Sequence, residues 1–261
     1  MMEKREIKYT SQYEILSFDT DYLGMAHLSC LMNYLQDAAR LHSIKEGFSV
    51  FDLFKKGVTW VVSRYHLKIN RYPALSEKIF VRTWASDKYG YYALREFEVA
   101  DEKQEPILVA ASSWMIIDLQ NRRPIKIENL FPDELVLRER VLEDDFPQLP
   151  VVETLDYKAT FRVLFEDLDY NRHVNNVVYS RWAVEGMPQE ILFSSRPTEL
   201  EINYRSEAFY GDEIEVITQK PGNIDDFWIQ QIYNLKTGKE VARLRARWKR
   251  YEQFNHEKIK K

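Results

Sequence analysis

The residues most suited to chemistry lie close together in the second half of the chain. The run from Asp167 to Asn176 contains two aspartates, three asparagines and one histidine. A histidine can donate or accept a proton near neutral pH, and a carboxylate can activate a water molecule. The run also precedes a helical pattern, and the unpaired N–H groups of a helix start can stabilise an oxyanion. These groups are the ones needed to hydrolyse a thioester without a covalent intermediate.

The same run also has a purely structural interpretation. Asp and Asn before a helix are common N-caps and turn formers, and a single His in such a turn is more often structural than catalytic. Residue types alone leave both interpretations open. A calcium site is excluded, because Arg172 and Val178 occupy the positions at which an EF-hand loop requires Gly and Glu.

Several other chemistries lack their residues. The sequence contains no Gly-x-Ser-x-Gly, no nucleotide-binding glycine loop and no His-Glu-x-x-His. Cys30 is the single cysteine, so an internal disulfide and a cysteine-based zinc site are excluded by count. We expect no metal ion and no cofactor.

The elements that would position the run form an internal repeat. Apolar residues recur at three- and four-residue steps over Leu28–Glu46 and again over Val174–Met187, which predicts two helices. A period-two pattern follows each helix and predicts strands at 59–69, 75–84, 91–100 and 107–119, then at 200–204, 212–219, 227–235 and 241–251. Residues 236–239 are a candidate hairpin turn. The chain thus contains two copies of a long helix followed by antiparallel strands. This arrangement is typical of an α+β fold in which a curved sheet wraps each helix.

The repeat divides the chain into four parts. We expect an N-terminal unit over 1–131, an exposed proline-containing and acidic linker over 132–157, a C-terminal unit over 158–251 and a polar tail over 252–261. The alternative to a true repeat is that the chain consists of two ordinary α+β halves whose similarity is accidental.

Composition limits the partners and the compartment. The net charge of −4 gives no reason to expect nucleic-acid binding. No apolar run approaches the ~20 residues of a membrane span, and the N-terminus does not read as a secretory signal. The expected location is the cytoplasm.

The run resembles the signature of plant and bacterial acyl-ACP thioesterases. The stretch 167–176 reads Asp-Leu-Asp-Tyr-Asn-Arg-His-Val-Asn-Asn, close to the family's D-L-D-x-N-x-H-V-N-N. Segments 33–39, 60–64, 71–73, 83–84, 112–115 and 121–124 resemble the first half of the family, so most of 8–250 is covered. The resemblance implies a tandem (double) hotdog fold and hydrolysis of fatty acyl groups carried on acyl carrier protein.

The resemblance also implies the catalytic residues. The family's Asp, Asn and His fall on Asp169, Asn171 and His173, and its downstream acidic residue falls on Glu207 in Tyr-Arg-Ser-Glu. Many plant members have a cysteine next, where this chain has Ala208, so a cysteine nucleophile is not expected. We expect Glu207 to activate water, with His173 as the alternative base.

The first half is expected to supply the acyl pocket. Its corresponding turn, 21–27, lacks the Asn and the spacing of the catalytic run. The candidate lining residues are Leu31, Met32, Leu35 and Trp60, although an apolar stripe at helical spacing is more often plain core.

Acyl carrier protein is acidic, so a basic surface should bind it. Alternation along the last strand places four cations on one face, at Arg243, Arg245, Arg247 and Lys249. The alternative is a solvated outer face. Two other functions remain open, an acyl-CoA thioesterase and a non-catalytic acyl-binding protein, and the chain could be a monomer or a homodimer.

Overall fold

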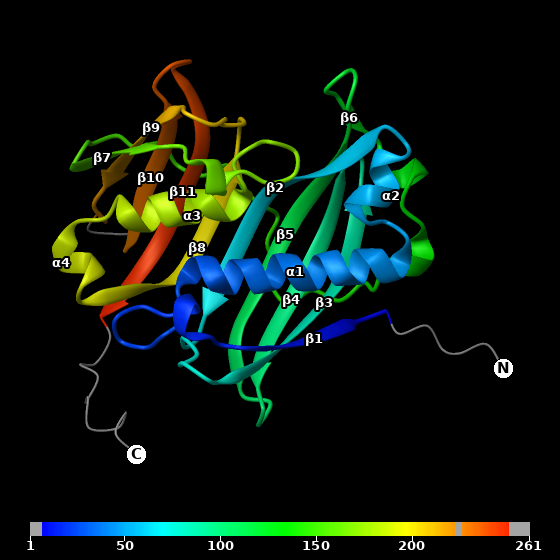
Figure 1. The fold of residues 1–261 in the computed structure, drawn as a ribbon, viewed down its shortest axis with the longest axis horizontal. Helices are drawn as coiled ribbons and strands as arrows, with labels where there is room; N and C mark the ends of the chain where they lie inside the picture. Colours follow the sequence, from blue (N-terminus) through cyan, green and yellow to red (C-terminus); the bar gives the residue numbers. More distant parts are fainter. Residues whose placement is uncertain (1–6, 223–225, 251–261) are drawn as a thin grey trace.

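One antiparallel sheet runs through both halves of the chain (Figure 1). The structure, a computed structural model, describes residues 7–222 and 226–250. The sheet order is β1-β3-β4-β5-β2-β8-β11-β10-β9-β7, with β6 beside β5. The strands of the first half are β1 (Tyr9–Glu14), β2 (Val58–Ile69), β3 (Lys78–Tyr89), β4 (Tyr92–Asp101), β5 (Pro106–Asp118) and β6 (Pro124–Ile125). Those of the second half are β7 (Tyr157–Arg162), β8 (Ser195–Tyr204), β9 (Glu213–Gln219), β10 (Phe227–Asn234) and β11 (Lys239–Arg250).

The two halves are joined through β2 and β8. These strands pair over a short length, from Arg64 opposite Asn203 to Lys68 opposite Glu199. Beyond Arg64, toward the start of β2 at Val58, β5 pairs with β2 and β8 does not. The halves therefore share one sheet but separate at one end of the joint.

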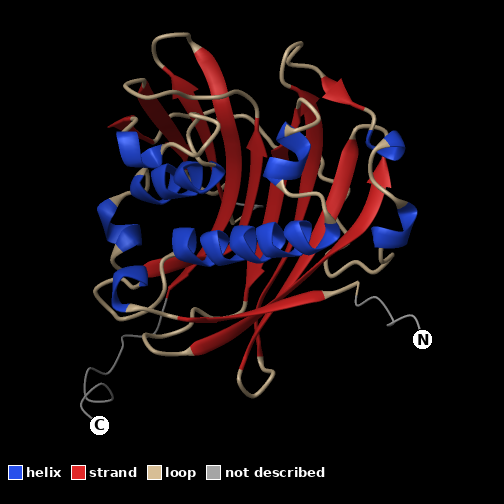
Figure 2. Cartoon of the chain, turned by 45° about the vertical axis from the view of Figure 1, so that its right-hand side comes forward, coloured by secondary structure: helices blue, strands red, loops and turns tan. Residues whose placement is uncertain are grey.

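The two long helices lie on the same side of the sheet (Figure 2). They are α1 (Leu28–Glu46) and α3 (Asn176–Glu185); the short helices are α2 (Val50–Phe54) and α4 (Gln189–Leu192). One face of α1 is buried, and each fully buried Leu or Met adds about 1.5–3 kcal/mol of stability. Gly47 ends α1 in the left-handed conformation, at φ 74°, which glycine adopts without strain. Within the described ranges no helix is long and apolar enough to cross a membrane.

The predicted elements are largely confirmed. The first helix has the bounds that the apolar spacing predicts, and the second lies inside its predicted range. The turn at 236–239 joins β10 to β11, with Gly238 at φ 67°. β1 was not predicted, because this edge strand is half exposed and interleaves polar with aromatic residues. The α+β class is confirmed, while residue 251 and the tail at 252–261 lie outside the described residues.

The connector at 132–157 is only in part the exposed linker that its prolines and acidic residues predict. Leu142 and Phe146 are buried against Leu94 and Ala111 of the sheet. Ala110, the neighbour of Ala111, belongs to the core beneath the helices, so the connector covers the opposite face of the sheet. Composition alone does not reveal that a proline-containing segment has a sheet face to cover.

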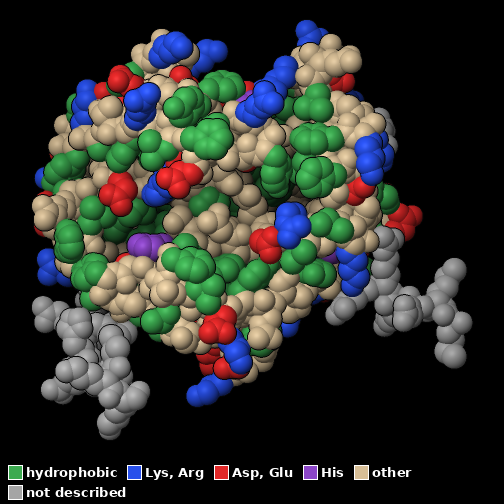
Figure 3. Space-filling model, in the orientation of Figure 1, with side chains coloured by type: hydrophobic (Ala, Val, Ile, Leu, Met, Phe, Trp, Pro, Cys, Tyr) green, Lys and Arg blue, Asp and Glu red, His purple; other side chains and the backbone are tan. Residues whose placement is uncertain are grey.

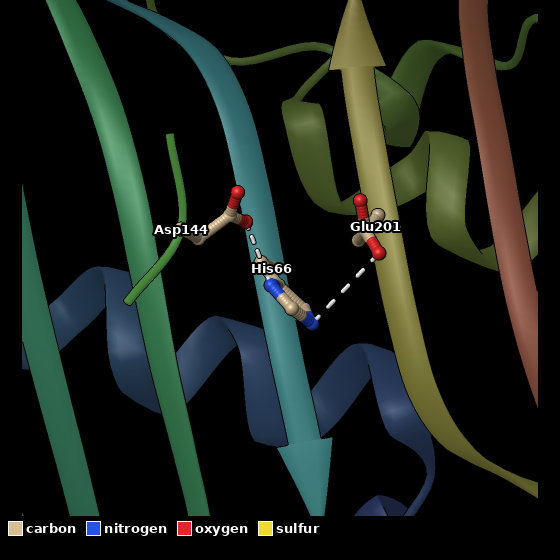
Figure 4. Close-up of side chains that lie close together, drawn as sticks. All are labelled: His66, Asp144 and Glu201. Carbon is tan, nitrogen blue, oxygen red and sulfur yellow. Dashed lines mark hydrogen bonds and ion pairs between the residues drawn. The ribbon is translucent and has the colours of Figure 1, made fainter. Parts of the chain in front are cut away.

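A buried histidine fixes the connector to both halves (Figure 4). His66 of β2 directs its Nδ1 to Oδ2 of Asp144 in the connector, at 2.7 Å, and its Nε2 to Oε1 of Glu199 on β8, at 3.0 Å. Burial by itself lowers the pKa of His66, but Asp144, Glu201 and Glu199 outweigh burial, and the net pKa is raised.

Candidate active site

Two members of the polar run build the turn rather than the chemistry. Asp167 is buried, accepts a hydrogen bond from Leu164 N–H at 2.8 Å and pairs with Arg181. The Asn175 side chain caps α3 by accepting from Val177 N–H at 3.0 Å. The structural interpretation therefore holds for Asp167 and Asn175.

Asp169 holds Asn171 in place. Its Oδ1 accepts the backbone N–H of Asn171 at 2.8 Å, and its Oδ2 accepts the side-chain amide at 3.3 Å. The turn closes through a hydrogen bond from Asp169 N–H to the His173 carbonyl at 2.9 Å. Arg172 takes φ 63° within it, a conformation that costs a non-glycine residue energy.

Glu207 meets His173 as the resemblance implies. A hydrogen bond from Val174 N–H to the Ala208 carbonyl, at 3.0 Å, brings the two segments together. His173 Nδ1 then lies 3.2 Å from Oε1 of Glu207. Glu207 also pairs with Arg122, from the turn between β5 and β6 in the first half. The role of Arg122 was not foreseen, although it lies in a segment that resembles the family.

The first half repeats this turn without its chemistry. Asp21 N–H donates to the Met25 carbonyl at 2.9 Å, as Asp169 N–H does to that of His173, and Gly24 has φ 71° where Arg172 has 63°. The first turn therefore repeats the backbone, but it lacks the Asn and the residue spacing as expected, because Leu23 and Met25 stand where Asn171 and His173 do.

The equivalent of Glu207 in the first half is also identifiable. The bond from Ala26 N–H to the Pro73 carbonyl corresponds to that from Val174 N–H to the Ala208 carbonyl. Tyr72, which precedes Pro73, therefore stands where Glu207 does. Its hydroxyl is buried and donates to the Pro197 carbonyl at 2.7 Å, a structural contact.

A cavity of about 680 Å³ connects the two halves beside this cluster. Figure 3 shows the face that carries both long helices, with a recess near its middle. The size is that of an ordinary small-molecule site. The second half contributes the polar turn around Asn171 and the segment Tyr204–Glu207, and the first half contributes the remaining walls. The lining residues from the first half include Ala39, Trp60, Val62, Ala85, Ala93, Trp114 and Phe131.

The expected lining residues are only partly right. Trp60 lines the cavity, and its ring N–H donates to the Phe48 carbonyl at 2.9 Å. Leu31, Met32 and Leu35 instead lie in the core, each 1% exposed, and α1 presents Gln36, Ala39, Arg40 and Ser43 to the cavity. An apolar stripe cannot distinguish a residue that faces the core from one that faces a cavity.

The cavity wall carries a half-buried cation that the sequence did not reveal. Arg95 bonds to Nδ1 of His42 at 3.1 Å and to the Thr83 hydroxyl at 3.2 Å. Burial lowers the pKa of Arg95 to about 10, which still leaves the guanidinium charged at neutral pH.

A smaller cavity of about 270 Å³ lies next to the same cluster. It shares Val61, Tyr170, Asn171, His173 and Glu207 with the larger one. Its other lining residues are Phe54, Thr59, Ile117, Leu119 and Arg122. The candidate catalytic cluster of Asn171, His173 and Glu207 thus lines both cavities.

Two further groups do not suit catalysis. Burial, with Asp19 nearby, raises the pKa of the Cys30 thiol to about 12, so the thiolate nucleophile is suppressed. His66, Asp144 and Glu201 are spaced closely enough for a metal ion. However, the two ring nitrogens of His66 point to different carboxylates, and Arg245 binds Glu201 at 2.7 Å. We interpret this cluster as an ion-pair network.

Two of the four basic residues predicted to bind the carrier, Arg245 and Arg247 on β11, belong to the same network. Arg243 is buried and pairs with Glu240 at 2.7 Å, Arg245 pairs with Glu201, and Arg247 pairs with Asp226 at 2.7 Å. Lys249 is exposed. Three of the four predicted docking cations are thus neutralised by carboxylates, which favours the solvated outer face over the docking site.

Comparison with known sequences decides the family. Residues 6–135 match the acyl-ACP thioesterase N-terminal domain, and residues 153–250 match the C-terminal domain. The chain belongs to the acyl-ACP thioesterase family. The tandem hotdog that the resemblance implies is the fold of this family's solved structures.

Relatives and solved structures agree with this assignment. A palmitoyl-acyl carrier protein thioesterase from Cuphea hookeriana is 27% identical over 257 residues, covering 92% of this chain and 62% of the relative. The acyl-ACP thioesterase structure from Bacteroides thetaiotaomicron superposes with a TM-score of 0.82 at 25% identity, covering 95% of this chain and all of that one. The 12:0-ACP thioesterase of Umbellularia californica, at 24% identity and a TM-score of 0.82, shows the same fold over 96% of this chain and all of that one. The chain spans about 62% of the length of the first curated relatives it matches.

Proposed function

We propose that this protein hydrolyses fatty acyl-ACP thioesters to free fatty acids and holo-ACP. The observation that carries the proposal is the position of the His173–Glu207 pair, with Asn171, on the wall of a 680 Å³ cavity built by both halves. A fatty acyl chain would enter the cavity, and its thioester carbonyl would stop at the cluster. The family and the relatives' names support acyl carrier protein as the carrier.

The proposed chemistry is a direct attack by water. Glu207 accepts a proton from water as the water oxygen bonds to the thioester carbon. The carbonyl oxygen becomes an oxyanion, which Asn171 and His173 stabilise by donating hydrogen bonds, while Asp169 keeps Asn171 oriented. The C–S bond then breaks, the electron pair leaves on sulfur, and the thiolate takes up the proton.

The decisive experiment is hydrolysis of acyl-ACP by wild-type protein and by Glu207→Gln. We expect Glu207→Gln to lose most turnover, by about 100-fold or more, while acyl-ACP still binds, because the amide keeps the shape but cannot accept the proton. Glu213→Gln, at an exposed position at the start of β9, is the matched control. Full activity of Glu207→Gln would remove Glu207 as the base and favour His173.

The same assay separates the other functions. Release of fatty acid from acyl-CoA at a higher kcat/KM than from acyl-ACP would identify an acyl-CoA thioesterase. Tight acyl-ACP binding without release by the wild-type protein would identify an acyl-binding protein. Either result would contradict the proposal.

A further inference from the structure

The two cavities beside the catalytic cluster have the geometry of a two-armed substrate. A thioester has an acyl arm on the carbonyl side and a thiol arm on the sulfur side, and the two arms leave the reacting carbon in different directions. The cavities share the catalytic residues Asn171, His173 and Glu207, so a thioester held at the cluster can extend one arm into each. The 680 Å³ cavity has the room for a fatty acyl chain, which leaves the 270 Å³ cavity for the thiol arm.

The lining of the small cavity matches the chemistry of a pantetheine arm. Phe54, Ile117 and Leu119 provide apolar surface, and Thr59 provides a hydroxyl. A pantetheine arm alternates short methylene segments with two amide groups, so it needs both kinds of contact. A second fatty chain would leave the polar groups without partners.

Thr59 is the residue that points to a polar ligand. It is 3% exposed, lines the small cavity, and its hydroxyl has no hydrogen-bond partner among the residues that the structure describes. An unpaired buried hydroxyl is costly, and a ligand amide that bonds to it recovers that cost.

The local course of β2 makes room for such an arm. β8 pairs with β2 only from Arg64 onward, so the stretch from Thr59 to Val62 is not covered by β8. Val61, in the middle of this stretch, lines both cavities. The path from the large cavity to the small one therefore passes along β2 where the two halves separate.

We propose that the 270 Å³ cavity binds the pantetheine arm of the substrate and that the Thr59 hydroxyl hydrogen-bonds an amide of that arm. The inference rests on the proposed hydrolysis and adds the residue that recognises the thiol side of the thioester. We do not propose that Arg122 binds a phosphate group of the substrate, because its guanidinium is paired with Glu207.

The test compares two thioesters of one fatty acid. Acyl-pantetheine carries both amides, and the S-ethyl thioester carries neither. We expect Thr59→Val, which replaces the hydroxyl with a methyl group of similar size, to lower kcat/KM for acyl-pantetheine roughly two- to tenfold, the effect of one hydrogen bond. The same variant should leave kcat/KM for the S-ethyl thioester unchanged.

Further variants keep the test decisive. Thr59→Ser retains the hydroxyl and should keep the wild-type ratio of kcat/KM for acyl-pantetheine to kcat/KM for the S-ethyl thioester. This variant keeps the proposal testable if Thr59→Val does not fold. Leu119→Trp, at a position 36% exposed, narrows the same cavity and should raise KM for acyl-pantetheine alone. Thr160→Val, on an exposed part of β7, is the control and should change neither.

Binding of free pantetheine provides a readout independent of substrate turnover. Calorimetric titration of the wild-type protein should detect it, with Kd raised by Thr59→Val by the same two- to tenfold factor. Equal loss on both thioesters, or no loss on either, would overturn the proposal. If the wild-type protein bound pantetheine but hydrolysed no acyl-ACP, the hydrolase assignment would fail while the cavity assignment stood.

Discussion

At the scale of single residues, the sequence predicts the chemical groups better than their partners. Asp169, Asn171 and His173 lie within five positions, so their proximity follows from the chain itself. Glu207 was identified by family resemblance, and a backbone hydrogen bond to Ala208 explains why it arrives at the turn. Arg122 lies 85 positions before Glu207, and no local pattern predicts that contact.

Arg122 should act as a positioning residue for Glu207. We expect Arg122→Ala to lower kcat for acyl-ACP by about 10- to 100-fold, since a displaced catalytic group costs rate even when its own chemistry is intact. Arg122→Lys should restore part of kcat, because the ammonium keeps the charge but not the planar fork. Steady-state kinetics on purified protein measures both.

Arg123→Ala provides the control for Arg122, as an exposed neighbour in the same turn. It should have wild-type kcat. A rise in KM with unchanged kcat for Arg122→Ala would show instead that Arg122 binds the carrier and does not position Glu207.

At the scale of elements, apolar periodicity was reliable where one face of a helix or strand is buried. It predicted the bounds of α1 and the position of α3. It could not separate core from cavity on α1, because Leu35 and Ala39 have the same apolar character and differ only in which space they face. It also missed the buried face of the connector, whose apolar residues are widely spaced.

The cavity walls on β3 and β4 should set the acyl length. Ala93 is 6% exposed and lines the large cavity, so Ala93→Phe places a ring in the space the chain would occupy. We expect the released fatty acids to become shorter by several carbons, with kcat on short chains preserved. Gas chromatography of the acids released from a chain-length series of acyl-ACPs measures this change.

Ala159→Phe on β7 is the control for Ala93→Phe, because Ala159 does not line the cavity. It should leave the product profile unchanged. An unchanged profile in Ala93→Phe would mean that the acyl chain does not reach this wall.

At the scale of the whole molecule, ion pairs on the outer face of the sheet connect the two halves and the connector. His66 joins β2, the connector and β8, and Arg245 and Arg247 pair with carboxylates on β8. The sequence showed the cations of β11 in a row, but Arg245 and Arg247 pair with carboxylates on β8, a strand that meets β11 only in the folded sheet. These ion pairs favour a solvated outer face, and docking of the carrier on β11 stays a prediction.

This network should make stability depend on pH. Because the folded pKa of His66 is raised, its charged form stabilises the fold fully below about pH 6.5, the unfolded value, and that contribution is lost as pH rises through the folded pKa. The groups facing His66 are Asp144, Glu199 and Glu201, with Lys68, Arg245 and Arg247 bound to the glutamates. We expect the free energy of unfolding of wild type to exceed that of His66→Gln most near pH 6, and the difference to shrink toward pH 9.

Urea unfolding at a series of pH values measures this difference. His27→Gln, at an exposed position, is the control and should follow the wild-type profile. A difference between wild type and His66→Gln that did not vary with pH would show that the imidazole is held neutral.

The junction of β2 and β8 also has a consequence for the chain while it is being synthesised. Until β8 has been synthesised, some 130 residues after β2, the nascent first half ends its sheet at β2 with an open edge. Such an edge can pair with another chain, and charged side chains on it oppose that pairing. Arg64, His66 and Lys68 occupy alternate positions on the stretch that awaits β8. We therefore expect the residues that later join the halves also to oppose pairing of the unfinished protein with its own copies.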